Sequence, residues 1–300
     1  MRFGFRGGAA LLMVAALLPP SPAAGGGAPR CEGREATIVG TAGDDHLVGT
    51  DAQDVIVGLG GDDFLDGRAN LDLLCGGAGS DRFSAASGSD RVRAGRGRDV
   101  VDSGGSAILG RGHDRASGVS HVRGGPGNDR IVADDVRAEF HGGAGDDVLV
   151  GGEASPHDGG DVLHGGSGDD LLRGGGLLNF IAPGRGRDVV RMGAERRTWT
   201  GRLSYRSATR PIFVNLRRGI ARGQGRDLLF GVITWVDGSN AGDTIIGAPG
   251  RQVLLGFGGG DELFGRSGDD ELRGGGGSDA ADGGKGEDSC TAETTARCEG

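Results

Sequence analysis

A period of nine residues runs through this sequence and constrains its fold more than any other feature. From Cys31 to Asp102 the chain divides without a gap into nonapeptides, and Gly238 to Thr291 divides in the same way. Shorter runs of the same unit lie at 124–150 and 165–191. Self-similarity at a fixed, short period is typical of solenoid proteins rather than of an ordinary globular domain.

Position eight of the nonapeptide is apolar or cysteine throughout the two long blocks, although only 36% of the chain is apolar. We therefore predict that these side chains point inward and form the core. They are Ile38, Leu47, Ile56, Leu65, Leu74, Phe83, Val92, Val101, Ile245, Leu254, Leu263, Leu272, Ala281 and Cys290.

The first six positions of the nonapeptide form a turn that is rich in glycine, and glycine is 67 of the 300 residues. Gly76-Gly77-Ala78-Gly79-Ser80-Asp81 is a full example. Glycine tolerates positive φ, so a turn of this composition can curl tightly and point carbonyl groups inward. The three residues that follow alternate outward, inward and outward, which predicts a minimal strand with one buried side chain.

The complete pattern, Gly-Gly-x-Gly-x-Asp-x-apolar-x, resembles the haemolysin-type calcium-binding (RTX) repeat, and the resemblance covers most of residues 31–291. It implies an all-β fold: a right-handed parallel β-roll, or β-helix solenoid, with two nonapeptides in each coil. It also implies that several calcium ions are held between stacked turns.

The aspartates at position six support this arrangement, because many of them lie 18 residues apart and would stack in ten neighbouring pairs. Carboxylates repeated at the ~4.8 Å spacing of strands repel one another unless a cation lies between them. Calcium takes carboxylate and carbonyl oxygens, whereas magnesium insists on octahedral geometry and keeps its water. The candidate metal ligands are Asp45, Asp54, Asp63, Asp72, Asp81, Asp90, Asp99, Asp129, Asp147, Asp170, Asp188, Asp243, Asp261, Asp270, Asp279 and Asp288.

Three turns depart from this pattern, because Ala138, Asn179 and Gln252 stand where the repeat has aspartate. Alanine supplies no ligand and an amide supplies no charge. We expect calcium sites at these turns to be weak or absent.

The repeats divide the chain into segments. We predict a cleaved Sec signal peptide at 1–24, because two arginines precede the apolar run from Ala9 to Leu18. A short linker at 25–30 precedes the first β-roll, 31–191, which is irregular at 103–123 and 151–160. A β-rich insert at 192–237 separates it from the second β-roll, 238–291, and 292–300 forms a cap closed by a disulfide.

Four cysteines permit three disulfide pairings in a secreted chain. Their spacing favours Cys31–Cys75 and Cys290–Cys298, one pair at each end of the repeat array. A zinc site is the alternative, but the sequence has neither a close Cys-x-x-Cys nor clustered histidines.

The composition and motifs favour a secreted calcium-binding protein with a structural or interaction role, in which calcium is coupled to folding. A net charge of −9 disfavours nucleic acid as a partner, and no second apolar run predicts a membrane span. We predict no enzyme, because the sequence contains neither a zinc-protease motif nor Gly-x-Ser-x-Gly. Pro156-His157-Asp158 is the only segment that suggests acid–base chemistry, and we interpret it as surface.

Two alternatives remain open for the partner. The region 151–237 holds Trp199, Tyr205 and Trp235, all the Trp and Tyr of the chain, and could form a carbohydrate-binding or polysaccharide-active face outside the cell. The rolls could also stack end to end in an assembly. An unidentified extracellular protein or glycan is the expected partner.

Overall fold

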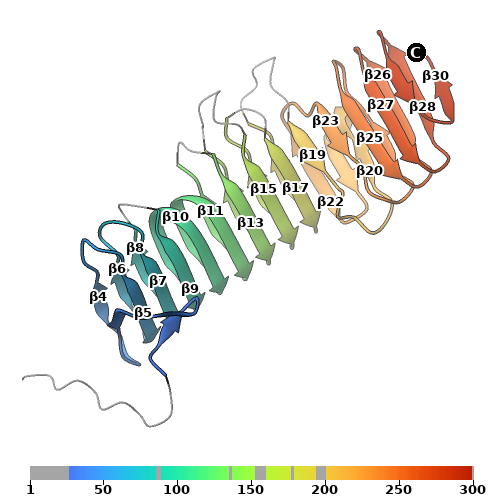
Figure 1. The fold of residues 1–300 in the computed structure, drawn as a ribbon. Coiled ribbons are helices and arrows are strands. Elements are labelled where there is room, and N and C mark those ends of the chain that lie inside the picture. Colours follow the sequence, from blue (N-terminus) through green and yellow to red (C-terminus); the bar gives the residue numbers. More distant parts are fainter. Residues whose placement is uncertain are drawn as a thin grey trace, which may run out of the picture.

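The computed structural model describes residues 27–85, 89–134, 137–152, 160–176, 179–193 and 201–298. These residues form a rod-shaped β-solenoid of about 13 stacked coils, with the N-terminal coils at one end and the C-terminal coils at the other (Figure 1). The predicted signal peptide at 1–24 lies outside the described residues.

In the regular coils each strand pairs in parallel with the strand two places further along the chain, so alternate strands build two facing sheets. Ile56 pairs with Leu74 in the first sheet, and Leu65 pairs with Phe83 in the second. Both pairings shift the chain by 18 residues, which confirms two nonapeptides per coil. The fold is the all-β roll that the repeat predicts.

The strands have the following bounds. The first sheet contains β3 (Ile38–Val39), β5 (Val55–Gly60), β7 (Leu73–Ala78), β9 (Arg91–Arg96), the later parts of β10 (Val100–Arg111) and β11 (Arg115–Pro126), β13 (Glu139–Ala144), β15 (Val162–Ser167), β17 (Phe180–Arg185), β19 (Arg202–Ser204), β23 (Trp235–Asp237), β25 (Val253–Gly258), β27 (Glu271–Gly276) and β29 (Ser289–Thr291). The second sheet contains β4 (His46–Val48), β6 (Phe64–Asp66), β8 (Arg82–Ser84), the early parts of β10 and β11, β12 (Arg130–Val132), β14 (Val148–Val150), β16 (Leu171–Arg173), β18 (Val189–Arg191), β22 (Arg226–Phe230), β21 (Ile220–Arg222), β20 (Phe213–Asn215), β24 (Thr244–Ile246), β26 (Glu262–Ser267), β28 (Ala280–Lys285) and β30 (Thr294–Ala296).

The core lies between the two sheets and contains the predicted position-eight side chains. Eleven of the fourteen are buried, whereas Ile38, Leu47 and Cys290 are only partly buried. Ile38 and Leu47 belong to the first coil and Cys290 to the last strand of the first sheet, so they lack neighbours on one side. The apolar ladder is therefore continuous along the rod and thins only at its ends.

The irregular stretch 103–123 stays inside the roll. Here the strands β10 and β11 each run for 12 residues and take part in both sheets, so a coil needs only 15 residues. Val101 still pairs with Ala116, and Ala116 with Ile131, so the core is unbroken. The shortened coils omit the glycine-rich turn at one edge of the roll.

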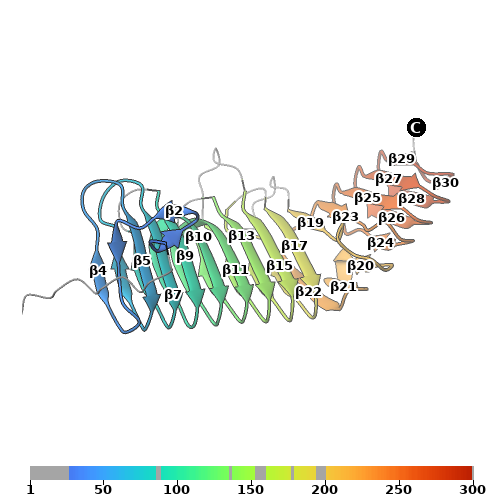
Figure 2. The ribbon, with the colours of Figure 1, turned by 60° about the horizontal axis from the view of Figure 1, so that its bottom comes forward.

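The insert at 192–237 adds strands to the two sheets unequally. Between β17 and β25 the first sheet gains β19 and β23, whereas between β18 and β26 the second sheet gains β22, β21, β20 and β24. β21 is antiparallel to both its neighbours. Two extra strands at ~4.8 Å each lengthen one side of the rod, and the rod changes direction at this point (Figure 2). The strand β20 ends at Asn215, because Leu216 begins the 3₁₀ helix η1 (Leu216–Arg218).

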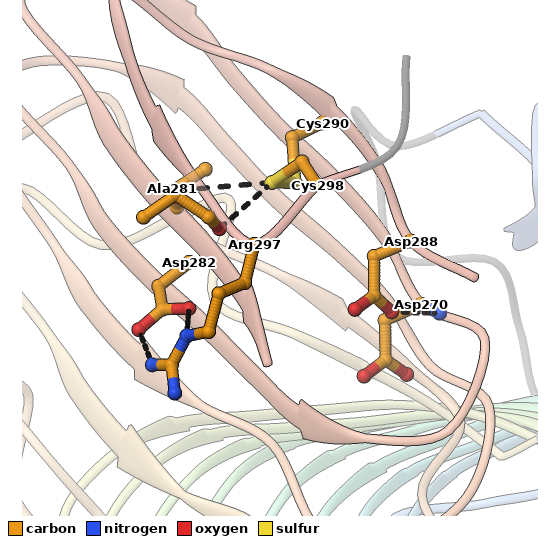
Figure 3. Close-up of a disulfide and its surroundings, with 8 residues drawn as sticks. Asp270, Ala281, Asp282, Asp288, Cys290, Arg297 and Cys298 are labelled. Carbon is orange, nitrogen blue, oxygen red and sulfur yellow. Dashed lines mark hydrogen bonds and ion pairs between the residues drawn. A yellow bond between two sulfur atoms is a disulfide. The ribbon is translucent and has the colours of Figure 1, made fainter. Parts of the chain in front are cut away.

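Disulfides tie down both ends of the rod, and both predicted pairings are confirmed. Cys31–Cys75 fastens the antiparallel hairpin of β1 (Arg30–Cys31) and β2 (Arg34–Glu35) to the outer face of the first sheet. Cys290–Cys298 closes the C-terminal coil, where Arg297 also pairs with Asp282 (Figure 3). The C-terminal bond holds β29 to the residues just after β30, and these last strands are where an open solenoid would otherwise be able to pair with another chain.

Candidate metal centre

The predicted aspartates stack in columns along the edges of the roll. In each predicted pair, the backbone N–H of one aspartate donates to Oδ1 of the aspartate 18 residues later. Asp63 donates to Asp81 at 3.0 Å, and Asp81 donates to Asp99 at 2.8 Å. All ten predicted pairs are joined in this way, at 2.7 to 3.0 Å. Aspartates that lie 18 residues apart in the sequence are therefore neighbours in the structure.

One column is longer than the spacing predicts, because it continues through coils of unequal length. We call it the long column, and it runs along the edge where the chain enters the second sheet. Its members are Asp45, Asp63, Asp81, Asp99, Asp114, Asp129, Asp147, Asp170, Asp188 and Asp227.

Sequence reasoning missed Asp114 and Asp227 in this column and Asp161 at the opposite edge. A signal for the first two was present, because Gly110-Arg-Gly-His-Asp114 and Gly223-Gln-Gly-Arg-Asp227 keep the end of the turn motif. A search with a fixed period passes over them, because Asp114 lies 15 residues after Asp99 and Asp227 lies 39 residues after Asp188.

The opposite edge carries an interrupted column. Asp54, Asp72 and Asp90 stack regularly, and the shortened coils then omit the turn. When the turns resume, Ala138 donates its N–H to Asp161, and Asp161 donates to Oδ1 of Asn179 at 3.1 Å. In this part of the interrupted column, both neighbours of Asp161 in the stack, Ala138 and Asn179, lack a carboxylate.

The second oxygen, Oδ2, is buried without a hydrogen-bond partner in fourteen aspartates of the described chain. A Cβ on Gly58 would collide with Oδ2 of Asp63 and would lie 2.7 Å from the carbonyl oxygen of Gly76 in the next coil. At this turn Oδ2 thus faces a space beside a backbone carbonyl of the next coil that a side chain at position 58 would fill. The fourteen are Asp63, Asp72, Asp81, Asp90, Asp99, Asp114, Asp129, Asp147, Asp170, Asp188, Asp261, Asp270, Asp279 and Asp288.

Burial and mutual repulsion make these carboxylates difficult to ionise without a counter-ion. Burial, followed by the charges of Asp188 and Asp147, raises the pKa of Asp170 to about 8. Burial likewise raises the pKa of Asp99 to about 7. A buried charge without a partner is strongly unfavourable, so each column requires either protons or cations.

The donors fit a hard divalent cation. Among the described residues, no three His, Cys, Asp or Glu side chains converge on one point that could hold a metal. A cation at Oδ2 would therefore complete its shell with backbone carbonyl oxygens, which calcium accepts readily in a flexible geometry. The geometry excludes the thiolate and imidazole set that a structural zinc requires, and all four cysteines are in disulfides.

The two amide positions differ from the carboxylate positions. Asn179 accepts from Asp161 through Oδ1 and donates through Nδ2 to the carbonyl of Gly176, at 3.2 Å. Gln252 similarly accepts from Ala248 and donates to the carbonyl of Gly250. The amide N–H groups contact turn carbonyls that an ion would otherwise bind. Weak or absent calcium binding at these turns stays a prediction.

A second hydrogen-bonded ladder, not foreseen from the sequence, runs along the exposed residues just before the aspartates. Ser80 donates its N–H to Oδ1 of Asp62 at 2.7 Å, and Asp169 donates to Asp146 at 2.8 Å. Arg187 continues this ladder and pairs its guanidinium with Asp169. These side chains satisfy turn amides on the solvent side and leave the inner carboxylates facing the carbonyls.

Tyr205 and Trp235, the described Trp and Tyr residues of the insert, do not share one surface. Tyr205 is buried and donates its hydroxyl to Oδ2 of Asp227 at 2.7 Å. Trp235 is half-buried on the outer face of the first sheet, with the Arg202 guanidinium 4.8 Å from its ring. Trp199 and His157 lie outside the described residues. A carbohydrate-binding face at 151–237 therefore stays a prediction without Tyr205.

Comparison with known proteins places the repeats in a family. None of the helices in the described parts of the chain has the length and apolar character needed to cross a membrane. No curated protein matches the chain. The family described as RTX calcium-binding nonapeptide repeat (4 copies) matches residues 37–74, 75–107, 116–135, 139–155, 157–190 and 255–290, which is more than half of the chain. With its stacked aspartates and its 18-residue coils, this chain belongs to the RTX calcium-binding nonapeptide-repeat family.

Proposed function

We propose that this chain is a secreted protein that folds around calcium ions held between its stacked turns, and that the resulting rod has a structural or interaction role outside the cell. The observation that carries the proposal is the set of fourteen buried Oδ2 atoms without a hydrogen-bond partner. No ordinary hydrogen bond replaces the water that these atoms lose on burial. A cation between the turns removes this deficit at each of them.

Calcium is the cation that the donors favour. A Cβ on Gly58 or Gly265 would meet both Oδ2 of the aspartate in the same turn and a carbonyl oxygen of the next coil. Such oxygen-rich and adjustable surroundings suit calcium, whereas magnesium requires near-octahedral geometry and dehydrates reluctantly. Asp63, Asp81 and Asp261 would hold ions through Oδ2, while their Oδ1 atoms accept the N–H of the preceding coil.

Coupling to folding follows from the small core and the charged edges. The core is a ladder of single side chains between two narrow sheets. Because the metal sites exist only when coils stack, the free energy of calcium binding becomes free energy of folding. We expect the calcium-free chain at neutral pH to be largely disordered.

Three features support an extracellular location. The predicted signal peptide would direct the chain to the Sec pathway. Disulfides such as Cys31–Cys75 and Cys290–Cys298 persist mainly in oxidising compartments. Extracellular calcium is abundant enough to fill the weak sites that extracellular calcium modules use.

Calorimetric titration of the chelator-treated chain tests the proposal. We expect calcium to bind at several sites per chain, with heat that includes folding, and magnesium at the same concentration to give little or no response. A chain that binds no calcium up to 10-fold above about 1 mM, the weak end of extracellular modules, would contradict the proposed function.

A test of export is whether a tagged full-length chain appears outside the producing cell without residues 1–24.

A further inference from the structure

The described aspartate turns include two hydrogen-bonding arrangements, which differ at the residue four positions before the aspartate. In the first arrangement this residue is Thr or Ser. Thr50 donates its N–H to Oδ2 of Asp54 at 2.7 Å and its hydroxyl to the same oxygen at 2.9 Å. Thr41 makes the same two bonds to Asp45, at 2.5 and 3.0 Å. We call these closed turns, because two donors already occupy Oδ2.

Ser239 forms a third closed turn, with its N–H 2.6 Å and its hydroxyl 3.1 Å from Oδ2 of Asp243. In the second arrangement, which we call the open turn, Oδ2 has no donor. The residue four positions earlier then has positive φ in every open turn in which that residue is described. These residues are Leu59, Arg68, Gly77, Gly95, Gly110, Gly125, Gly143, Gly166, Gly184, Phe257, Arg266, Gly275 and Gly284.

The backbone angle explains the difference. Thr41, Thr50 and Ser239 lack positive φ, and their N–H groups point at the carboxylate. A β-branched residue at positive φ is strongly disfavoured, so threonine holds its turn in the closed arrangement. Glycine has no such restriction, and at Leu59, with φ of 82°, the turn is open even with a side chain.

The closed turns keep the rest of the metal-site geometry. A Cβ on Gly49 would lie 2.6 Å from the carbonyl oxygen of Gly67. In the neighbouring open turn, a Cβ on Gly58 would similarly lie 2.7 Å from the carbonyl oxygen of Gly76. The difference is confined to the donors that face Oδ2. N–H and O–H groups present their positive ends to that oxygen, so they take the place of a cation and repel one.

We infer that the residue four positions before each aspartate determines whether that turn takes calcium: Thr or Ser closes it, and a residue at positive φ leaves it open. The inference rests on the proposed function and goes beyond it, because it assigns occupancy turn by turn. It assigns no ion to the turns of Asp45, Asp54 and Asp243, although all three carry the family aspartate.

The closed turns lie where the columns begin. Thr41 and Thr50 belong to the first turns at the two edges of the roll, and Ser239 belongs to the first glycine-rich turn after the insert. The far end of the long column departs from this rule, because Gly223 has positive φ but the hydroxyl of Tyr205, from outside the turn, occupies Oδ2 of Asp227. Each of the two long repeat blocks therefore starts on a turn that needs no calcium, against which the calcium-dependent coils can stack.

Counting bound calcium in paired variants tests the inference. The variant Thr41→Gly/Thr50→Gly/Ser239→Gly opens three turns, and we expect about three more ions per chain than in the wild type, measured in parallel by equilibrium dialysis and metal analysis. The matched control, Thr41→Ser/Thr50→Ser/Ser239→Thr, keeps all the donors, and we expect the wild-type number.

The reverse change keeps the inference testable if the glycine variant does not fold. Leu59→Thr/Phe257→Thr closes two open turns, and we expect about two fewer ions, whereas Leu59→Gly/Phe257→Gly preserves positive φ and the wild-type number. Equal ion counts in the threonine and glycine versions would overturn the inference. A wild-type chain that binds no calcium would instead overturn the proposed function.

Discussion

The two edges of the N-terminal roll share the same coils, yet they carry different numbers of carboxylates. The long column continues from Asp45 to Asp227, and eight of its members have a buried and unpaired Oδ2. The interrupted column has only Asp72 and Asp90 in that state, and its later turns contain Ala138, Asn179 and an Asp161 whose Oδ2 accepts the N–H of Gly175 at 2.8 Å.

This difference shows that the apolar ladder and the metal column are separable. Where β10 and β11 omit a turn, the core pairing of Val92 with Ala107 and of Ala107 with Val122 continues. The sheets need one apolar residue per strand, whereas a metal site needs a complete glycine-rich turn. One edge can therefore lose its metal sites while the rod remains continuous.

The largest expected effect is a pH dependence of the calcium-free chain that originates in the long column. Burial raises the pKa of Asp147 and Asp188 to about 7 and that of Asp170 to about 8. Because these folded-state pKa values exceed the unfolded value near 3.9, the folded state binds more protons, and its stability rises as pH falls from about 8 toward 4. We expect a chain disordered in EGTA at pH 7.5 to gain β-structure near pH 5.

Thermal unfolding followed by circular dichroism in EGTA, at pH values from 8 to 5, measures this effect. Hydrogen exchange at pH 5 locates it, with protection expected first along the long column. A calcium-free chain that loses structure on acidification would contradict the assignment of raised pKa values to these carboxylates.

A single substitution in the long column should have the next largest effect. Asp147→Asn keeps Oδ1 as the acceptor for Asp129 but removes the charge. One ion bound at 100 times its Kd contributes about 2.7 kcal/mol, so we expect a loss of about 3 kcal/mol in saturating calcium and no loss in EGTA at pH 5. The control is Asp146→Asn on the exposed ladder, for which we expect a change within about 0.5 kcal/mol. Equal losses in the two variants would remove the distinction between inner and outer aspartates.

A charge introduced at the interrupted edge should have the smallest effect. Asn179→Asp replaces the amide donor that faces Gly176 by a carboxylate oxygen. We expect a loss of about 1–2 kcal/mol without calcium, which calcium restores. Asn128→Asp, at an exposed position, is the control and should be neutral. Denaturant unfolding with and without calcium checks the pair, and a calcium-independent loss at Asn179 would indicate that this edge cannot take an ion.

The periodic part of the structure could be predicted from the sequence. Residues such as Leu65 and Leu254 occupy the core because one apolar side chain per nonapeptide is all that a narrow roll can bury. The ten aspartate pairs follow from their spacing together with the two-nonapeptide coil that the family resemblance implies, and both disulfides follow from the spacing of the cysteines. The calcium-binding family follows from the same repeat.

Other features depend on geometry that a period does not contain. Asp114 and Asp227 escaped prediction because coils of unequal length change the spacing between stacked turns. The closed turn at Thr50 depends on φ, and neighbouring open turns with Leu59 or Phe257 at positive φ give no local sign of that conformation. The antiparallel β21 is likewise fixed by its partners β20 and β22 rather than by its own three residues.

Far-UV circular dichroism of the chain at pH 7.5, first in EGTA, then through a calcium titration, with magnesium as the control, tests calcium-coupled folding most directly. We predict a disordered spectrum that changes cooperatively to β-structure with calcium and does not change with magnesium. A spectrum that is already β-structured in EGTA and indifferent to calcium would contradict this account, because the fourteen buried and unpaired Oδ2 atoms would then be accommodated without an ion.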